Sequence, residues 1–216
     1  GLLSSSLVRS FMFLGMYGCF FMGALFLERV KGYGALDTGV AFLPMTIVVA
    51  ILSSGVTAKL VGRFGPMRVL LPALACTIAG LALLTQVSAG GGYFPLMLGA
   101  FILMGVGMGS ASVPLLTIAM ANVPPADAGL ASGIVNVSMQ VAGALGVAVL
   151  GTVATDRTRT LATAGHSLPV ALTGGYRLGF TVAAACALAA LLVAASVLRG
   201  PRREPVPQTA SAEGAA

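Results

Sequence analysis

Few side chains in this sequence could carry covalent or metal chemistry, and they are scattered. The three cysteines, Cys19, Cys76 and Cys186, each lie inside an apolar run, with neither metal-ligand spacing nor a paired pattern. Such cysteines serve as small packing residues. His166 is the single histidine and lies in a polar segment. No cluster of His, Asp, Glu or Cys could form a reaction centre. The sequence therefore predicts no enzyme, no bound metal and no cofactor.

The clearest functional pattern is a stripe of small and polar residues suited to noncovalent binding. Gly133, Asn136, Gln140 and Gly143 are spaced at i, i+3, i+7 and i+10, which places them on one face of a helix. Gly129 and Gly133 also form a GxxxG pair, which allows helix backbones to approach closely. Amides inside a membrane need partners or water, so the stripe is predicted to face protein or a cavity. For Asn136 and Gln140, cavity lining and hydrogen bonding between helices are equally good interpretations.

The elements that hold these residues must be membrane helices. The chain is 57% hydrophobic and 8% charged, with a mean hydropathy of +0.99. Soluble domains contain about 25% charged residues, so this composition cannot cover a soluble surface. The net charge is +6, and the arginines lie in loops and at chain ends. This placement favours contact with the membrane surface over nucleic acid as a partner.

Charge-free runs divide the chain into spans, because a charge at mid-bilayer is costly and a span needs about 20 residues. The predicted fold is an all-α integral membrane bundle of six helices over 1–198. A disordered cytoplasmic tail is predicted over 199–216. We also predict a hairpin at 88–92 and a polar loop at 156–175. The expected spans are 8–28, 37–60, 67–88, 93–121, 128–153 and 176–198.

An even number of spans puts both ends of the chain on one side, and the basic residues favour the cytoplasm for that side. The protein is therefore expected in the cell (inner or plasma) membrane as a multi-pass protein with cytoplasmic termini. The expected inner residues are Arg9, Lys59, Arg63, Arg68, Arg199, Arg202 and Arg203, against Arg29, Lys31, Arg157, Arg159 and Arg177 outside.

The segment "GRFGPMR", 62–68, concentrates charge and glycine between two apolar spans. Gly62 and Gly65 permit a tight turn, and Arg63 and Arg68 hold the loop at the membrane surface. The segment resembles the loop signature G-x-x-x-D-R-x-G-R-R of the major facilitator superfamily. Arg63 matches the signature arginine and Gly65 its second glycine. The remaining signature positions differ in this chain: Ala58, Gly62, Pro66 and Met67.

Two longer stretches resemble the drug:proton antiporter-2 family of that superfamily, the fourteen-span multidrug exporters. They are "GYGALDTGVAFLPM" (32–45) and "VPPADAGLASGIVNVSMQVAGALGVAVLGTV" (123–153). The chain departs from the family pattern at Met139, where an arginine is frequent, and at Glu28, where a neutral polar residue is usual. The resemblance extends from about residue 7 to about residue 199 and corresponds to the C-terminal six-span half of the fold.

The resemblance implies the C-terminal half of a proton-coupled bacterial exporter of amphiphilic drugs, with a role in antibiotic resistance. Its partners would be membrane lipid, the amphiphilic substrate and the N-terminal half, which would hold the proton-carrying carboxylates. The first, second, fourth and fifth spans would line the cavity and the other two would lie outside. The candidate cavity residues are Met16, Tyr17, Phe20, Met104, Met108, Asn136 and Gln140. Arg63, Gly65 and Arg68 would form a gating loop, and Gly129, Gly133 and Gly143 would serve helix packing.

Other interpretations remain open at this point. For any single Met or aromatic candidate, ordinary helix packing is favoured over substrate contact. The chain could also be a truncated, non-transporting remnant, or a half-transporter that assembles with a partner. A facilitator for a small metabolite is a further alternative. The scarcity of polar groups in the expected cavity argues against a sugar as its substrate.

Overall fold

The computed structural model describes residues 2–121 and 123–199. Within these residues, the regular elements of secondary structure are helices. The predicted tail, 199–216, lies outside the described residues from 200 onward. In chain order the elements are α1 (Leu2–Arg29), α2 (Ala35–Ile51), the π-helical turn η1 (Leu52–Val56), α3 (Thr57–Phe64), α4 (Pro66–Leu84), α5 (Leu96–Met120), the 3₁₀ turn η2 (Pro125–Asp127), α6 (Ala128–Thr163) and α7 (Leu168–Arg199).

Six of these helical segments are long and apolar enough to cross a membrane, as the charge-free runs predict. One of the six is composite, because α2, η1 and α3 follow one another without a loop over 35–64. The turn expected at 88–92 lies within the connection between α4 and α5.

The polar loop predicted over 156–175 is wrong, because α6 continues to Thr163 and only 164–167 separate it from α7. Polarity forbids insertion into lipid but does not forbid a helix beyond the bilayer. Threonine hydroxyls on this extension donate to backbone carbonyls one turn back, for example Thr160 Oγ1 to Asp156 O at 2.9 Å. Gly165, with a φ of +89°, follows the end of α6.

The second span is broken rather than continuous as predicted. Ser54 (φ −72°, ψ 18°) and Gly55 (φ 114°, ψ −12°) leave helical geometry inside η1. Such a φ favours glycine because it has no Cβ. After the break, the buried Thr57 Oγ1 donates to Gly109 O at 3.2 Å, which ties α3 to α5. The break therefore redirects the second half of the span without detaching it from the bundle.

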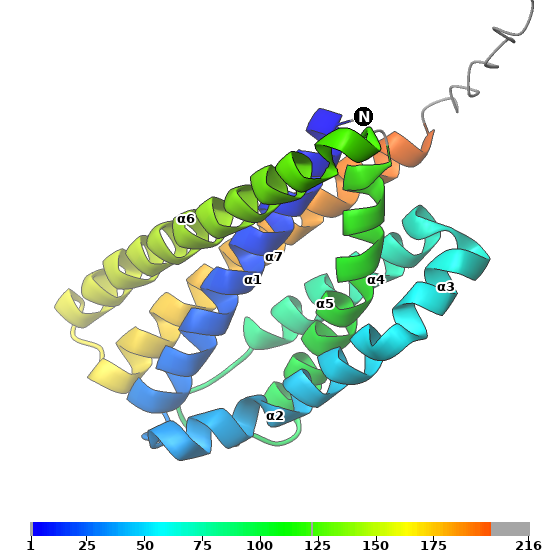
Figure 1. The fold of residues 1–216 in the computed structure, drawn as a ribbon. Helices are drawn as coiled ribbons and strands as arrows, with labels where there is room; N and C mark the ends of the chain where they lie inside the picture. The colour runs from blue at the N-terminus through cyan, green and yellow to red at the C-terminus, as the bar shows by residue number, and fades with distance from the viewer. Residues whose placement is uncertain (1, 122, 200–216) are drawn as a thin grey trace, which may run out of the picture.

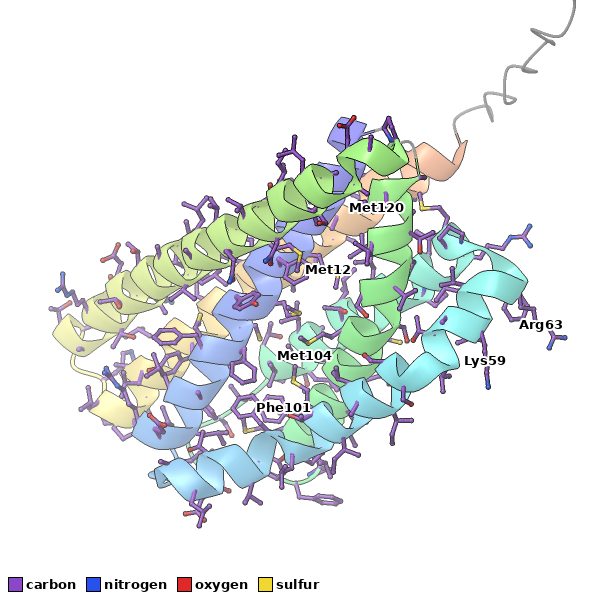
Figure 2. The ribbon with its side chains drawn as sticks, viewed as in Figure 1. Met12, Lys59, Arg63, Phe101, Met104 and Met120 are labelled. Carbon is purple, nitrogen blue, oxygen red and sulfur yellow. The ribbon has the colours of Figure 1, made fainter. Side chains whose placement is uncertain are left out.

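The turn between α3 and α4 depends on one residue. Gly65 has a φ of +85°, and Pro66 is the first residue of α4, a position where its fixed φ and missing N–H suit a helix. The prediction that Gly62 also shapes this turn is wrong, since Gly62 lies within α3. Figure 2 shows Lys59 and Arg63 projecting from α3 away from the other helices.

The helices pack as two groups of three. α1 contacts α6 and α7, while α5 contacts α2 and α4. The two groups meet mainly where α4 packs on α7. Figure 1 shows α1, α2, α5 and α6 nearest the viewer, with α4 and α7 farther back. The helices therefore group as the resemblance implies, with the third and sixth spans on the far side of the bundle.

Close helix contacts within each group depend on glycine. A Cβ on Gly146 of α6 would overlap the backbone carbonyl of Leu14 in α1, with Leu14 C at 2.8 Å. A Cβ on Gly107 of α5 would lie 2.7 Å from Ala73 O in α4. At Gly146 the backbones of two helices touch without an intervening side chain, whereas at Gly107 the Thr77 hydroxyl also lies against the glycine. Such close approach strengthens van der Waals packing in a membrane.

A row of aromatic rings joins the two groups on the near side. The Phe20 ring of α1 lies 4.5 Å from that of Phe42 in α2, and Phe42 lies 4.7 Å from Phe101 in α5. Phe42 and Phe101 are buried, while Phe20 is 46% exposed. Ring pairs at these distances are favourable beyond their buried area. The row therefore bridges α1, α2 and α5, where few other contacts join the groups.

Two basic side chains tie loops together at the end of the bundle where α1 and α4 finish. Lys31 Nζ donates to the carbonyl oxygens of Ser88 (3.0 Å), Ala89 (3.1 Å) and Gly91. Arg177 Nε of α7 donates to Thr85 O at 2.6 Å. An ammonium has three N–H donors, so the three carbonyls use its full capacity. Burial lowers the pKa of Lys31, whereas the carbonyls favour its charged form.

Lys31→Met is expected to destabilise the protein by about 2 kcal/mol, because it removes charge-assisted hydrogen bonds and leaves carbonyls in the 88–91 loop unpaired. The measurement is thermal unfolding of the purified protein in detergent, followed by circular dichroism. Lys59→Met is the matched control, since Lys59 is exposed and points away from the bundle in Figure 2. Equal losses for both variants would contradict a structural role for the Lys31 contacts.

Candidate functional site

The candidate site lies on the near side of the bundle in Figure 1, formed by α1, α2, α5 and α6. The helices on this side differ in how far the chain itself covers them. Of the most apolar 18 residues in each span, 17% are buried in the second span and 28% in the fifth, against 50% in the first and fourth. The second and fifth spans therefore offer most of their surface to something other than this chain.

Two aromatic side chains of α1 open onto this side. Tyr17 is 41% exposed and Phe20 46% exposed. Phe20 is held by stacking on Phe42, and the Tyr17 ring lies 6.0 Å from that of Phe13. Both candidates from the sequence are thus placed where a ligand could contact them, on a helix that packs firmly at its back.

The polar stripe of α6 runs next to Tyr17. A Cβ on Gly143 would lie 3.0 Å from Tyr17 Cγ, so the end of the stripe packs under that ring. One and two turns earlier, Gln140 and Asn136 are exposed. The structure therefore brings Tyr17, Asn136 and Gln140 to the same side of the bundle. Within this chain the two amides face an open surface.

The methionine candidates lie deeper. Met16 and Met104 are buried, and Met108 is half-buried. Met104 belongs to the main hydrophobic core, together with Phe101 and Leu81. Figure 2 shows Met104 and Phe101 close together in the interior between α1 and α2. In this conformation these methionines pack the bundle.

The three glycines predicted to serve helix packing have different surroundings. Gly143 contacts Tyr17, as described above. Gly129 and Gly133 are exposed, and no atom lies within 4 Å of the position that a Cβ would take on either. The GxxxG pair therefore packs against no helix of this chain in the described residues.

The loop residues predicted to gate the protein lie at the turn between α3 and α4. Arg63 is exposed, with its guanidinium carbon 5.5 Å from the Phe64 ring centre. Arg68 lines an apolar cavity of about 270 Å³ together with Leu60 and Pro72. Gly65 forms the turn between these two arginines. The three residues lie together at one end of the bundle, distant along the chain and the helices from Tyr17.

Sequence reasoning missed the contacts that hold the ends of the site helices. Tyr93 Oη donates to Ala41 O at 2.6 Å and so fixes the loop before α5 against α2. Burial, and to a smaller degree Tyr33, raises the pKa of Tyr93, so its phenol keeps the proton that it donates. Aromatic residues near span ends signal such anchors in general, but no local pattern identifies the partner. Among the described residues, no group of three or more His, Cys, Asp or Glu could hold a metal ion.

Comparison with known proteins gives a consistent assignment. The family model described as Major Facilitator Superfamily matches residues 2–147. The puromycin resistance protein pur8 of Streptomyces alboniger is 38% identical over 204 residues, which cover 92% of this chain and 41% of that protein. The tetracenomycin C resistance and export protein of Streptomyces glaucescens is 33% identical over 150 residues, 69% of this chain and 27% of that protein.

A third relative, the cephamycin export protein CmcT of Amycolatopsis lactamdurans, is 37% identical over 138 residues, 62% of this chain and 27% of that protein. The chain thus spans about two fifths or less of the length of the curated relatives that it matches. The family match covers more than half of the chain, and six of its helical segments are able to cross a membrane. This chain is a multi-pass membrane protein that belongs to the major facilitator superfamily.

Proposed function

We propose that the chain is the C-terminal six-helix half of a proton-coupled secondary transporter. This transporter exports amphiphilic drugs or related small molecules by alternating access. The relatives named as resistance and export proteins support this class of function. Transporters of this kind place their substrate between two halves near the middle of the bilayer. The closer assignment to the drug:proton antiporter-2 family comes from the two resembling stretches, 32–45 and 123–153.

The observation that carries the proposal is the exposure of Asn136 and Gln140 on the side of the bundle that presents Tyr17. Both amides lie near the middle of the apolar part of α6, where exposure to lipid would leave their polar groups unpaired. A water-filled cavity or a second half of the transporter would satisfy them. The open GxxxG pair at Gly129 and Gly133 would then pack against that second half.

Proton movement is assigned to the other half of the transporter. The apolar parts of the spans in this chain contain no Asp or Glu near their centres, and a proton relay normally needs an intramembrane titratable group. We place the termini in the cytoplasm, because the α3–α4 turn with its basic residues lies at the same end of the bundle as the N-terminus and the end of α7 (Figure 1). Arg63, Gly65 and Arg68 would then bias the inward and outward states from the cytoplasmic side.

The test is export of ethidium by cells that produce the native protein. The double variant Asn136→Leu with Gln140→Leu is expected to lower the export rate about tenfold, because it removes the amides from the cavity wall. Ser138→Leu is the matched control. It is exposed at the same depth, but two residues along a helix correspond to about 200° of rotation, so it faces the other way. Unchanged export by the double variant, or an equal loss with Ser138→Leu, would contradict the proposed cavity.

A further inference from the structure

A cavity of about 370 Å³ lies between α1, α6 and α7, remote from the polar stripe of α6. It occupies the end of the bundle where α6 finishes, and Figure 1 shows the start of α7 between the ends of α1 and α6 there. Arg29 contributes from α1 and Arg159 from α6, while hydroxyl groups come from Thr155, Thr158 and Tyr176. From the sequence, Arg29 and Arg159 are predicted only to lie on the outer side of the membrane.

The charge of this cavity is uniformly positive. Arg29 and Arg159 come from different helices and line the same space, and no acidic side chain is among the lining residues. The acidic neighbours along the chain, Glu28 and Asp156, are exposed and stand outside the lining. Both arginines are exposed, so their guanidinium groups can reach an anion that enters the cavity. Their planar forks match carboxylate oxygens and form short, charge-assisted hydrogen bonds with them.

Tyr176 adds an uncharged hydrogen-bond donor that is held in a fixed position. The Tyr176 ring is buried and packs edge-on against Phe26, with ring centres 6.0 Å apart and planes at 90°. This packing fixes the direction of the phenol at the cavity wall. Thr158 Oγ1 already donates to Ala154 O at 2.8 Å. The Tyr176 hydroxyl can therefore donate to an anion held by the two arginines.

The rest of the wall is apolar and belongs to the same helices. Leu25 and Phe21 lie one and two turns before Arg29 on α1, and Leu172 lines the same wall from α7. A volume of this size falls within the range of about 300 to 1,000 Å³ that small-molecule pockets have. The site thus combines an apolar chamber with a cationic end, which fits an amphiphile that has a charged group at one end of an apolar body.

We propose that this cavity binds small amphiphiles that carry a carboxylate, with the carboxylate between Arg29 and Arg159 and the apolar body against Phe21 and Leu25. The inference rests on the proposed function, because it names the substrate class of the exporter. In the proposed orientation the cavity lies at the outer end of the bundle, where it would hold an anionic substrate before release. Arg29 lies twelve residues after Tyr17 on the same helix, about 18 Å along its axis, which separates this cavity from the central site at Tyr17.

Direct binding tests this inference without relying on transport. The native protein, purified in an uncharged detergent, is titrated with dansylglycine and with its methyl ester, which differ only in the carboxylate. Fluorescence reports binding of both. We expect the acid to bind about tenfold more tightly than the ester. The double variant Arg29→Gln with Arg159→Gln is expected to bind acid and ester equally. Arg159→Lys should keep part of the preference, because lysine retains the positive charge but cannot form two parallel hydrogen bonds with a carboxylate.

Arg157→Gln is the matched control, since Arg157 is exposed on the same helix and is not among the lining residues. It is expected to keep the preference for the acid. Equal affinities of the native protein for acid and ester would overturn the proposal. So would an equal loss with Arg157→Gln. Displacement of dansylglycine by phosphatidylglycerol at concentrations below the Kd of dansylglycine would also overturn it, because it would indicate a lipid site. A protein that prefers the acid but exports neither ethidium nor dansylglycine would retain this site and contradict only the proposed function.

Discussion

Replacing Gly146 with alanine is expected to destabilise the bundle by about 3 kcal/mol, near the upper end of the range for overpacking. A Cβ at this position would overlap the backbone carbonyl of Leu14, and Leu14 C would lie 2.8 Å away. A flexible side chain could rotate out of the way, but a helix backbone cannot. α1 and α6 would have to separate along their contact. Thermal or denaturant unfolding in detergent, followed by circular dichroism, measures the loss.

The same helix provides a control for this substitution. Gly133 is exposed, with no atom within 4 Å of the position of its missing Cβ. Gly133→Ala therefore adds the same methyl group without a clash, and alanine favours a helix by about 1 kcal/mol over glycine. We expect unchanged or slightly raised stability. A loss for Gly133→Ala in the isolated chain, or none for Gly146→Ala, would show that the helix contact is not the one described.

Phe42→Ala is expected to cost about 2 kcal/mol, because it opens a void in the aromatic row between Phe20 and Phe101. In water a Phe→Ala change in a core costs about 3 to 5 kcal/mol. The smaller value is expected here because detergent or lipid is as apolar as the core, so the transfer part largely cancels and the packing part remains. The measurement is again unfolding in detergent.

The row also predicts a specific structural change in this variant. Phe20 would lose its stacking partner, so its exposure to an aqueous quencher should rise, and the two three-helix groups should move more freely on the near side. Phe94→Ala is the control, since Phe94 is 73% exposed in a loop. Equal destabilisation by both variants would mean that the loss does not come from ring packing in this row.

Composition predicts the number of crossings well in this chain, since charges are excluded from the bilayer interior and mark the ends of each span. It predicts the ends of helices poorly. The polarity of the segment after Thr155 predicts a loop, yet the segment continues α6 to Thr163, because the same charges that prevent insertion are compatible with a helix in water. The break at Ser54 and Gly55 had a local signal in its serine and glycine residues, but apolar runs on both sides masked it.

The candidate site, too, can be predicted from the sequence only in part. Helical spacing correctly places Asn136 and Gln140 with Gly143 on one stripe, because side-chain direction repeats with the helix turn. Burial does not follow from spacing. Met16 and Tyr17 are neighbours in sequence, yet one is buried and the other 41% exposed. The contacts of Lys31 with Ser88 and Gly91 link residues 57 and 60 positions apart. Such contacts depend on which loops meet after the helices have packed.

The partners of α1 have a consequence for how the protein is made. α1 leaves the ribosome before the other helices described here, but it packs on α6 and α7, which follow all the others among them. α2, α4 and α5 lie close together along the chain and can assemble while synthesis continues. Throughout that time Gly15 and Gly18, which contact α7 and α6 in the finished bundle, remain uncovered. The earliest of these helices to enter the membrane is thus the last to find its place, and the quality of the final assembly depends on α7 arriving before α1 pairs elsewhere.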